Sequence, residues 1–193
     1  DIGGPVPGSC SGKATDIYSE GMHFPAIRFV QNGVVSVEVE SIIRTNSRTP
    51  DLVMGDIRGQ LGCCHVGSGR LQELSAKYGY RKLVDAIEQR IVAVKKIIHS
   101  EISSWPDHEA VGDRLMDDDG IIIGVPIKVA VVLKKQGSNL SFDFSETADQ
   151  AKGPINIRPS LVRAACAYTV IASIGRSITV NQGILDAFDV ITR

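Results

Sequence analysis

The residues best suited to chemistry lie in one polar stretch in the C-terminal third of the chain. This stretch, DFSETADQAKGPIN at residues 143–156, carries carboxylate and amide side chains at Asp143, Gln150 and Asn156. Such side chains orient a polar substrate by hydrogen bonds when rigid elements flank the loop that carries them. A structural interpretation is equally consistent with the residues, because Asn156 and Ser160 also suit the cap of a following helix. Both interpretations stay open from the sequence.

Asn181 presents the same two alternatives as the polar stretch. It opens the short segment Asn181-Gln182-Gly183, which follows the alternating residues SITV at 177–180. An amide side chain at this place either lines a site or shapes a turn, since asparagine favours both roles.

Two runs of donor side chains could ligate a metal ion. Asp117, Asp118 and Asp119 precede Gly120 and offer carboxylates to a hard cation, but an extended backbone would send alternate side chains to opposite faces. We therefore favour a solvated turn there, with Gly120 supplying the bend.

Cys63-Cys64-His65 is also rich in donors, but helical neighbours point about 100° apart and no second donor pair has zinc spacing. We interpret the two thiols as small packing groups.

A phosphate-binding loop is excluded around Gly12-Lys13. Such a loop needs a glycine five positions before the Gly-Lys pair and a hydroxyl residue after it, and these positions hold Pro7 and Ala14. The chain also lacks a G-x-G-x-x-G segment. If this protein takes part in an ATP-dependent reaction, we expect another chain or segment to bind the ATP.

Composition excludes several function classes. The net charge of −1 creates no general attraction to nucleic acid or anionic membranes, and 5% aromatic residues are too few for a base-stacking surface. No apolar run approaches the ~20 residues that span a bilayer. The four cysteines have adjacent or wide spacings that indicate reduced thiols. We expect a cytoplasmic protein with neither nucleic-acid nor membrane partners.

The first half of the chain is expected to contain short strands and two helices. Residues 23–30 read as a strand, and Asn32-Gly33 predicts a hairpin with residues 34–39. A helix should begin at Thr49-Pro50-Asp51, with glycines 67 and 69 as possible interruptions. The apolar stripe over 81–104 predicts a second, amphipathic helix.

The second half predicts a hairpin followed by a helix. Strands are expected over residues 127–134 and 140–145, and a helix over 159–174, which should be buried nearly all round because only Arg163 is charged. This order indicates an α+β fold without βαβ alternation. A soft boundary near residue 106 divides 1–106 (glycine-rich loop, short strands and two helices) from 107–193 (hairpin plus buried helix), as parts of one domain.

Six segments in order resemble the hydantoinase B/5-oxoprolinase family. They are DIGGPVPGS at 1–9, EGMHFPAIRF at 20–29, RTPDLVMGDIRGQ at 48–60, DDDG at 117–120, DFSETADQAKGPIN at 143–156 and VNQG at 180–183. This family includes B subunits of ATP-dependent N-methylhydantoinases, the C-terminal part of 5-oxoprolinase, and subunits of acetone and acetophenone carboxylases. The resemblance covers essentially the whole chain and implies an internal portion of a larger subunit.

The resemblance implies a division of labour within a hetero-oligomer. A hydantoinase A-type ATPase partner would bind ATP and phosphorylate a carbonyl or enol oxygen of the substrate, and the B part would complete hydrolysis or carboxylation. The chain is thus expected to be part of a hydrolase subunit for a lactam such as a hydantoin or 5-oxoproline. The alternatives are a subunit of a ketone carboxylase and a non-catalytic assembly module whose helices at 50–66 and 81–104 dock the ATPase.

The resemblance also implies a divalent metal ion, Zn²⁺, Mn²⁺ or Fe²⁺, held by Asp and His side chains. In the family the DIGG segment follows a histidine-rich stretch, so Asp1 is the expected metal ligand of this chain. The expected catalytic residues are Asp143, Gln150, Asn156 and Asn181, and the expected substrate-binding glycines are Gly3, Gly4 and Gly153.

Overall fold

The fold is given by a computed structural model that describes residues 2–9, 11–175 and 177–192. The chain forms two compact units. The first comprises Asp1–Lys77 together with Lys152–Pro154, and the second comprises Tyr78–Ala151 together with Ile155–Arg193. Residue 106, where the sequence changes from helical to strand character, lies within the second unit.

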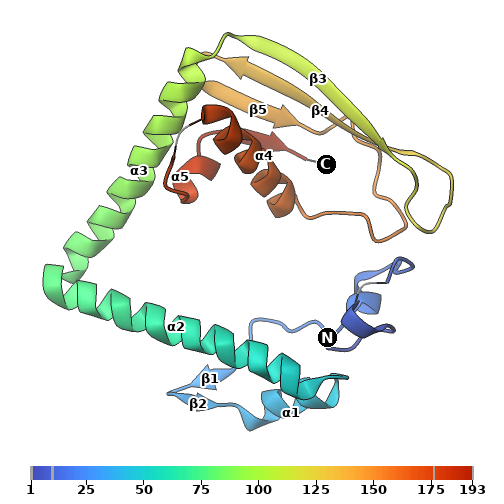
Figure 1. The fold of residues 1–193 in the computed structure, drawn as a ribbon, viewed down its shortest axis with the longest axis vertical. Helices are drawn as coiled ribbons and strands as arrows, with labels where there is room; N and C mark the ends of the chain where they lie inside the picture. Colours follow the sequence, from blue (N-terminus) through green and yellow to red (C-terminus); the bar gives the residue numbers. More distant parts are fainter. Residues whose placement is uncertain (1, 10, 176, 193) are drawn as a thin grey trace. The chain divides into compact units, whose positions relative to one another are not determined.

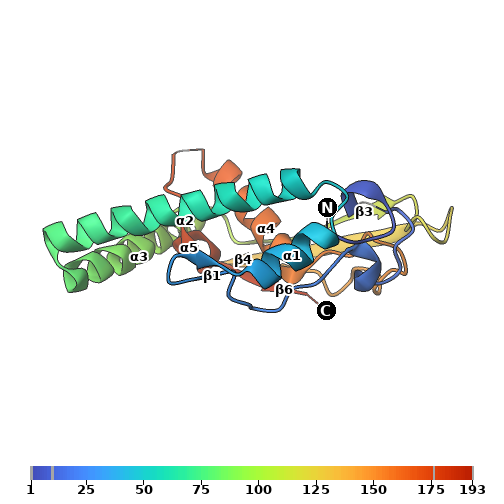
Figure 2. The ribbon, with the colours of Figure 1, turned by 90° about the horizontal axis from the view of Figure 1, so that it is seen from below.

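The first unit contains short elements followed by a long helix. In chain order these are η1 (Pro7–Ser9), η2 (Ile17–Glu20), β1 (Val30–Gln31), β2 (Val34–Val35), α1 (Val37–Thr45) and α2 (Pro50–Tyr78). In Figures 1 and 2, α1 lies beside the first turns of α2. Ile43 of α1 packs there with Val53 and Met54 of α2, and these three side chains form the buried cluster of this unit.

The predicted hairpin is confirmed, but its strands are shorter than expected. Asn32 and Gly33 both adopt positive φ, 52° and 80°, as a tight two-residue turn requires. The expected strand at 23–30 contributes only its last residue, and the one at 34–39 ends after Val35. Helix α1 replaces the rest, because the Ser36 hydroxyl caps it and two glutamates lie in its first turn.

Helix α2 begins at Pro50, as predicted, and runs without a break for 29 residues. The possible interruption at Gly67 and Gly69 does not occur. Each glycine costs a helix about 1 kcal/mol relative to alanine, which weakens a helix without ending it.

The second unit places helices against a four-stranded sheet. Its elements are α3 (Tyr80–Ser104), β3 (His108–Met116), β4 (Ile127–Gln136), β5 (Asn139–Asp143), α4 (Pro159–Ile174), α5 (Gln182–Leu185) and β6 (Asp189–Ile191). The strand order is β3-β4-β5-β6, with β6 parallel to β5 and the other pairs antiparallel. The predicted hairpin of β4 and β5 and the helices α3 and α4 are confirmed, as is the α+β class.

The core of this unit lies between the sheet and the helices α4 and α5, which occupy one side of it (Figure 1). Ile98 and Ile102 of α3 are fully buried, and Phe142 of β5 meets Phe188 edge to face with ring centroids 5.7 Å apart. Helix α4 differs from the prediction of burial on all sides. Its buried residues are Cys166, Ala167 and Val170, whereas its Tyr168 is 75% exposed.

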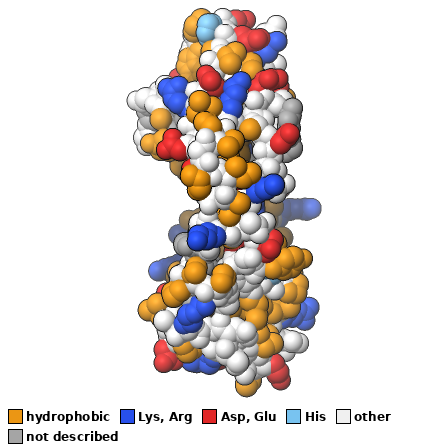
Figure 3. Space-filling view, turned by 90° about the vertical axis from the view of Figure 1, so that its right-hand side faces the viewer, with side chains coloured by type: hydrophobic (Ala, Val, Ile, Leu, Met, Phe, Trp, Pro, Cys, Tyr) orange, Lys and Arg blue, Asp and Glu red, His pale blue; other side chains and the backbone are white. Residues whose placement is uncertain are grey.

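Many other apolar side chains reach the surface of the chain, where Figure 3 shows them in orange among charged groups. Even so, none of the helices in the described part of the chain combines the length and the apolar character needed to cross a membrane.

Candidate functional site

The polar stretch at 143–156 is a loop whose first anchor is Asp143, the last residue of β5. The Asp143 carboxylate accepts a hydrogen bond from the Ser145 backbone N–H at 2.9 Å. Two hydrogen bonds from Ser145 lower the pKa of Asp143. The bond from the Ser145 side chain has the larger effect, and the bond from its backbone has the smaller one. The side chain therefore carries a fixed negative charge near neutral pH, which suits an acceptor role and not that of a general acid.

The second anchor of the loop is Thr147, which the sequence patterns do not single out. Its hydroxyl donates to the Ala130 carbonyl at 2.9 Å and accepts from the Ala130 N–H at 3.1 Å. Ala148 N–H adds a bond to the Lys128 carbonyl at 2.9 Å. The loop thus continues along β4 beyond the end of β5, which fixes the position of its first half.

The third anchor is Asn156, which bonds both backbone groups of Ala151. Its Oδ1 accepts from the Ala151 N–H at 2.9 Å and its Nδ2 donates to the Ala151 carbonyl at 2.8 Å. The alternative in which Asn156 and Ser160 cap α4 is wrong, because the N-cap residue is Arg158 and makes no side-chain cap bond. Asn156 instead closes the second half of the loop.

Gln150 and Gly153 lie between these anchors. Gln150 is exposed, so its amide is accessible to a ligand. Gly153 is buried and lies in the segment Lys152–Pro154, which belongs to the first unit.

Asn181 has a local structural task as well. Its Oδ1 accepts from the Gly183 N–H at 2.8 Å and thereby caps α5. Gly183 is buried against α3, and a Cβ there would lie 2.2 Å from the Ile91 carbonyl oxygen. Next to this contact, Arg90 donates to the Thr179 hydroxyl at 2.7 Å. The VNQG segment therefore joins α5 closely to α3.

The glycine loop of the first unit adopts a conformation that favours glycine. Gly3 and Gly4 have φ of 74° and 81°, and the Gly3 N–H donates to the Asn46 carbonyl at 2.6 Å. Met22 N–H donates to the Ile2 carbonyl at 2.8 Å. Arg48, which sequence reasoning missed, donates to carbonyl groups of this loop. The only sequence signal for it was its place at the start of the RTPDLVMGDIRGQ segment.

The expected metal ligand, Asp1, lies outside the described residues. Within the described ranges, no group of three or more His, Cys, Asp or Glu side chains is arranged to hold a metal ion. The acidic run forms the predicted turn: Asp118 accepts from Gly120 N–H at 2.9 Å, and Asp119 accepts from Ile121 N–H at 2.9 Å. The expectation that the run is solvated is wrong for Asp119, which is only 3% exposed. Cys63 and Cys64 are exposed, so their interpretation as packing groups is wrong for this chain.

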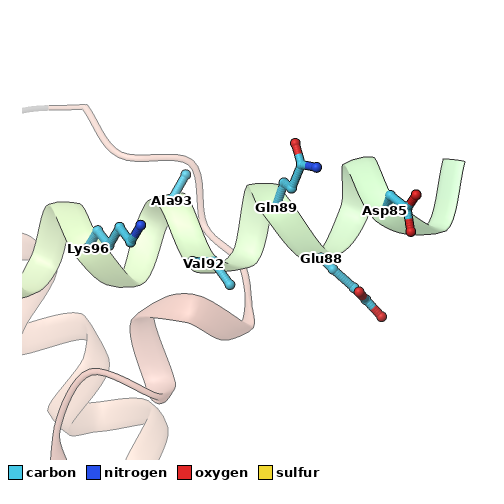
Figure 4. Close-up of a pocket in the computed structure, with 6 residues that line it drawn as sticks. All are labelled: Asp85, Glu88, Gln89, Val92, Ala93 and Lys96. Atoms are coloured by element: carbon cyan, nitrogen blue, oxygen red, sulfur yellow. The ribbon is translucent and has the colours of Figure 1, made fainter. Parts of the chain in front are cut away.

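A surface depression of about 420 Å³ occurs on α3 and has no counterpart among the predicted residues. In Figure 4 the side chains of Gln89 and Ala93 point to one side of the helix and those of Glu88 and Val92 to the other. The residues that line it are Asp85, Glu88, Gln89, Val92, Ala93 and Lys96. Because one helix alone supplies the lining, the depression does not enclose a small ligand.

The described contacts of Asp143, Asn156 and Asn181 include backbone groups close by in the sequence, so these side chains shape the segments that carry them. The strongest indication of the function of these segments comes from comparison with known proteins. Residues 1–193 match the family Hydantoinase B/oxoprolinase. The chain belongs to this family.

Two relatives and one solved structure illustrate the match. The B subunit of a D-/L-hydantoinase from Pseudomonas sp. (strain NS671) is 33% identical over 162 residues, which cover 81% of this chain and 27% of that protein. The acetophenone carboxylase delta subunit of Aromatoleum aromaticum (strain DSM 19018 / LMG 30748 / EbN1) is 22% identical, over 95% of this chain and 27% of that protein.

The crystal structure of ATP-dependent caprolactamase from Pseudomonas jessenii has the same fold. It superposes with a TM-score of 0.86 at 23% identity, over 100% of this chain and 33% of that chain. The chain therefore spans about a third or less of the length of these three proteins.

Proposed function

We propose that this chain is part of a B-type subunit that opens cyclic amides in an ATP-dependent complex. The observation that carries the proposal is the match of residues 1–193 to the hydantoinase B/oxoprolinase family. The names of the hydantoinase relative and of the structurally similar caprolactamase support a lactam-type substrate.

The chemistry explains why such a subunit would need a separate ATPase. An amide carbonyl carbon is a weak electrophile, and phosphorylation of its oxygen makes that carbon more reactive towards water. Water addition followed by cleavage of the ring C–N bond would release the ring nitrogen as an amine, and hydrolysis of the resulting acyl phosphate would give the carboxylate and phosphate. The sequence around Gly12-Lys13 lacks the glycine and hydroxyl of a phosphate loop, so we propose that a hydantoinase A-type partner binds ATP and that this chain receives the activated ring.

In this proposal Asp143 and Gln150 contact the substrate. The ionised Asp143 carboxylate would accept a hydrogen bond from the ring N–H or from the attacking water, and the exposed Gln150 amide would orient a ring oxygen. Asn156 and Asn181 would line the site while keeping their loops in place. Backbone contacts to the substrate at Gly3, Gly4 and Gly153 are a separate proposal, which rests on the close access that a residue without a side chain gives to its backbone.

The proposed metal ion is a separate hypothesis. The described residues do not supply a donor set for it, so no chemical step of this chain is derived through it. Asp1 would contribute one carboxylate to a site whose imidazoles come from outside these 193 residues. Comparison of the metal content of an Asp1→Ala variant with that of the parent subunit, in the full complex, tests this ligand directly.

The function is tested by measuring ATP consumption and product formation in the full subunit with its ATPase partner. We expect turnover with a member of a panel of lactams and hydantoins, without any need for bicarbonate. Asp143→Asn should lower kcat/KM by about tenfold or more, because one charge-assisted hydrogen bond is lost. An exposed carboxylate of the same unit, Asp113, provides the matched control as Asp113→Asn and should leave turnover unchanged.

The similarity to an acetophenone carboxylase subunit supports a second candidate, ATP-dependent carboxylation of a ketone. Turnover only with a ketone plus bicarbonate would replace the lactam hypothesis by this one. Unchanged turnover of Asp143→Asn, together with loss of complex formation on substitution of exposed residues in 81–104, would instead favour a non-catalytic assembly module.

A further inference from the structure

The backbone of the glycine loop presents several carbonyl groups to the Arg48 side chain. Gly3 and Gly4 both adopt positive φ, and a Cβ on Gly3 would lie 3.2 Å from the Met22 backbone nitrogen. A segment in such a conformation is held by its surroundings, because a free chain of this composition samples many others.

Arg48 binds these carbonyl groups from the segment just before α2. Its Nη2 donates to the Gly4 carbonyl at 2.7 Å, and its Nη1 donates to the Val6 carbonyl at 3.2 Å and more weakly to the Gly3 carbonyl at 3.5 Å. A guanidinium presents its donors in a rigid planar fork and always carries its charge, so one side chain can bind several carbonyl groups at once. A lysine at this position would place its three donors on a single nitrogen, without the planar fork that reaches separate carbonyl groups.

We propose that Arg48 is a positioning residue that holds the Gly3–Gly4 loop in its binding conformation. The proposal rests on the proposed function for the role of that loop in substrate binding. It also gives a physical reason why DIGGPVPGS at 1–9 and RTPDLVMGDIRGQ at 48–60 occur together: the first segment forms the loop and the second begins with the arginine that fixes it.

Arg48 does not belong to the buried cluster of the first unit. It is exposed, whereas the cluster consists of Ile43, Val53 and Met54, against which Ile2 of the loop packs. The loop has a further tie through Gly3 N–H and the Asn46 carbonyl. Loss of the guanidinium should therefore loosen the loop locally and leave α1 and the start of α2 intact.

The test compares Arg48→Met with Arg48→Lys and with the control Arg70→Met. Arg70 lies on α2 and forms a surface ion pair with Glu73 at 2.8 Å, which contributes little to stability. We expect hydrogen exchange at the Gly3 amide to accelerate by about tenfold or more in Arg48→Met, with exchange at Val53 and Met54 unchanged, an intermediate effect in Arg48→Lys and none in Arg70→Met.

In the full complex, Arg48→Met should raise KM by about tenfold with a smaller change in kcat, and added guanidinium should partly restore it. Unchanged exchange at Gly3, or equal acceleration throughout α1 and α2, would overturn the positioning role. Faster exchange at Gly3 with an unchanged KM would overturn the link to substrate binding. A parent complex inactive on the whole panel would remove the proposed function, and exchange at Gly3 would still decide whether Arg48 holds the loop.

Discussion

Lys135 is a charged side chain buried within the second unit, where the residue is only 5% exposed. Its ammonium donates to Asp107 Oδ1 at 2.8 Å and to the Trp105 carbonyl, and Asp107 also accepts from the Gly137 N–H at 2.9 Å. A buried charge needs such partners because water no longer solvates it. The three bonds fasten the segment after α3 to the turn between β4 and β5.

This pair makes stability depend on pH in a defined direction. The hydrogen bond from Lys135, followed by that from the Gly137 backbone, lowers the pKa of Asp107. A lowered pKa in the folded state means that the stabilisation is fully present above the unfolded value of about 3.9 and is lost as pH falls through the folded pKa. Asp107→Asn should therefore be less stable than the parent at pH 7, and this difference should shrink towards pH 3.

Urea unfolding of both proteins at pH 7, 5, 4 and 3 measures the effect, with Asp113→Asn as the control on an exposed strand residue. A stability difference between Asp107→Asn and the parent that stays constant over this range would contradict the assignment. Near pH 7 the control should unfold at the same urea concentration as the parent, because its side chain is solvated.

At the residue scale, the sequence identifies polar positions better than it identifies their partners. Asn156 and Asn181 are predicted to be either site residues or structural residues, and the structure gives both of them backbone contacts. Arg48 and Thr147 escape prediction because their partners, the carbonyls of Gly4 and of Ala130, are backbone groups far away in the sequence. Backbone acceptors leave no signature in side-chain patterns, so only the folded chain reveals such pairs.

At the element scale, α5 depends on the absence of one side chain. Gly183 is buried where α5 meets α3, and a Cβ would lie 2.2 Å from the Ile91 carbonyl oxygen and 2.9 Å from the Lys95 backbone nitrogen. Both neighbours are backbone atoms within a helix, so they cannot move aside as the end of a flexible side chain can. The space between the two helices thus admits only glycine.

Gly183→Ala should therefore destabilise the second unit by about 1–3 kcal/mol or more, the cost of overpacking a closed contact. Gly112→Ala is the matched control in the same unit, because a Cβ there would meet a Val131 methyl group at an ordinary 3.8 Å. The control should be neutral or slightly stabilising, by up to about 1 kcal/mol. Chemical unfolding followed by circular dichroism distinguishes the two, and equal midpoints for both variants would refute the argument.

Helices and strands are predicted correctly where an apolar pattern extends over many residues. They are predicted wrongly where a single capping residue determines which element forms. The 16 residues of α4 and the 25 of α3 are readable from apolar composition and periodicity. The alternation in VVSVEV predicts a strand where α1 begins, whereas the Ser36 cap starts a helix there. Strand β3 is absent from the prediction because its side chains are mostly exposed and do not alternate in polarity.

At the scale of the whole chain, the two units have cores of unequal size. The described core of the second unit contains residues from α3, β5, α4 and α5, including Ile98, Ile102 and Leu140. In the first unit only Ile43, Val53 and Met54 form such a cluster among the described residues, and further along α2 Leu71 is 52% exposed and Leu74 is 41% exposed. Buried apolar area is the main source of stability, so the units should differ in resistance to opening.

We therefore expect the first unit to open before the second when the chain is studied without any partner. Amide hydrogen exchange should be at least about a hundredfold slower at Ile98 and Ile102 in α3 than at Leu71 in α2. The difference should persist at urea concentrations below the main transition, where the first unit would already lose its protection. The amide of Val53, within the small cluster, serves as an internal control and should show intermediate protection. Similar protection at Ile98 and Leu71 would instead show that the chain unfolds as one cooperative body, with α2 stabilised by contacts outside the small cluster.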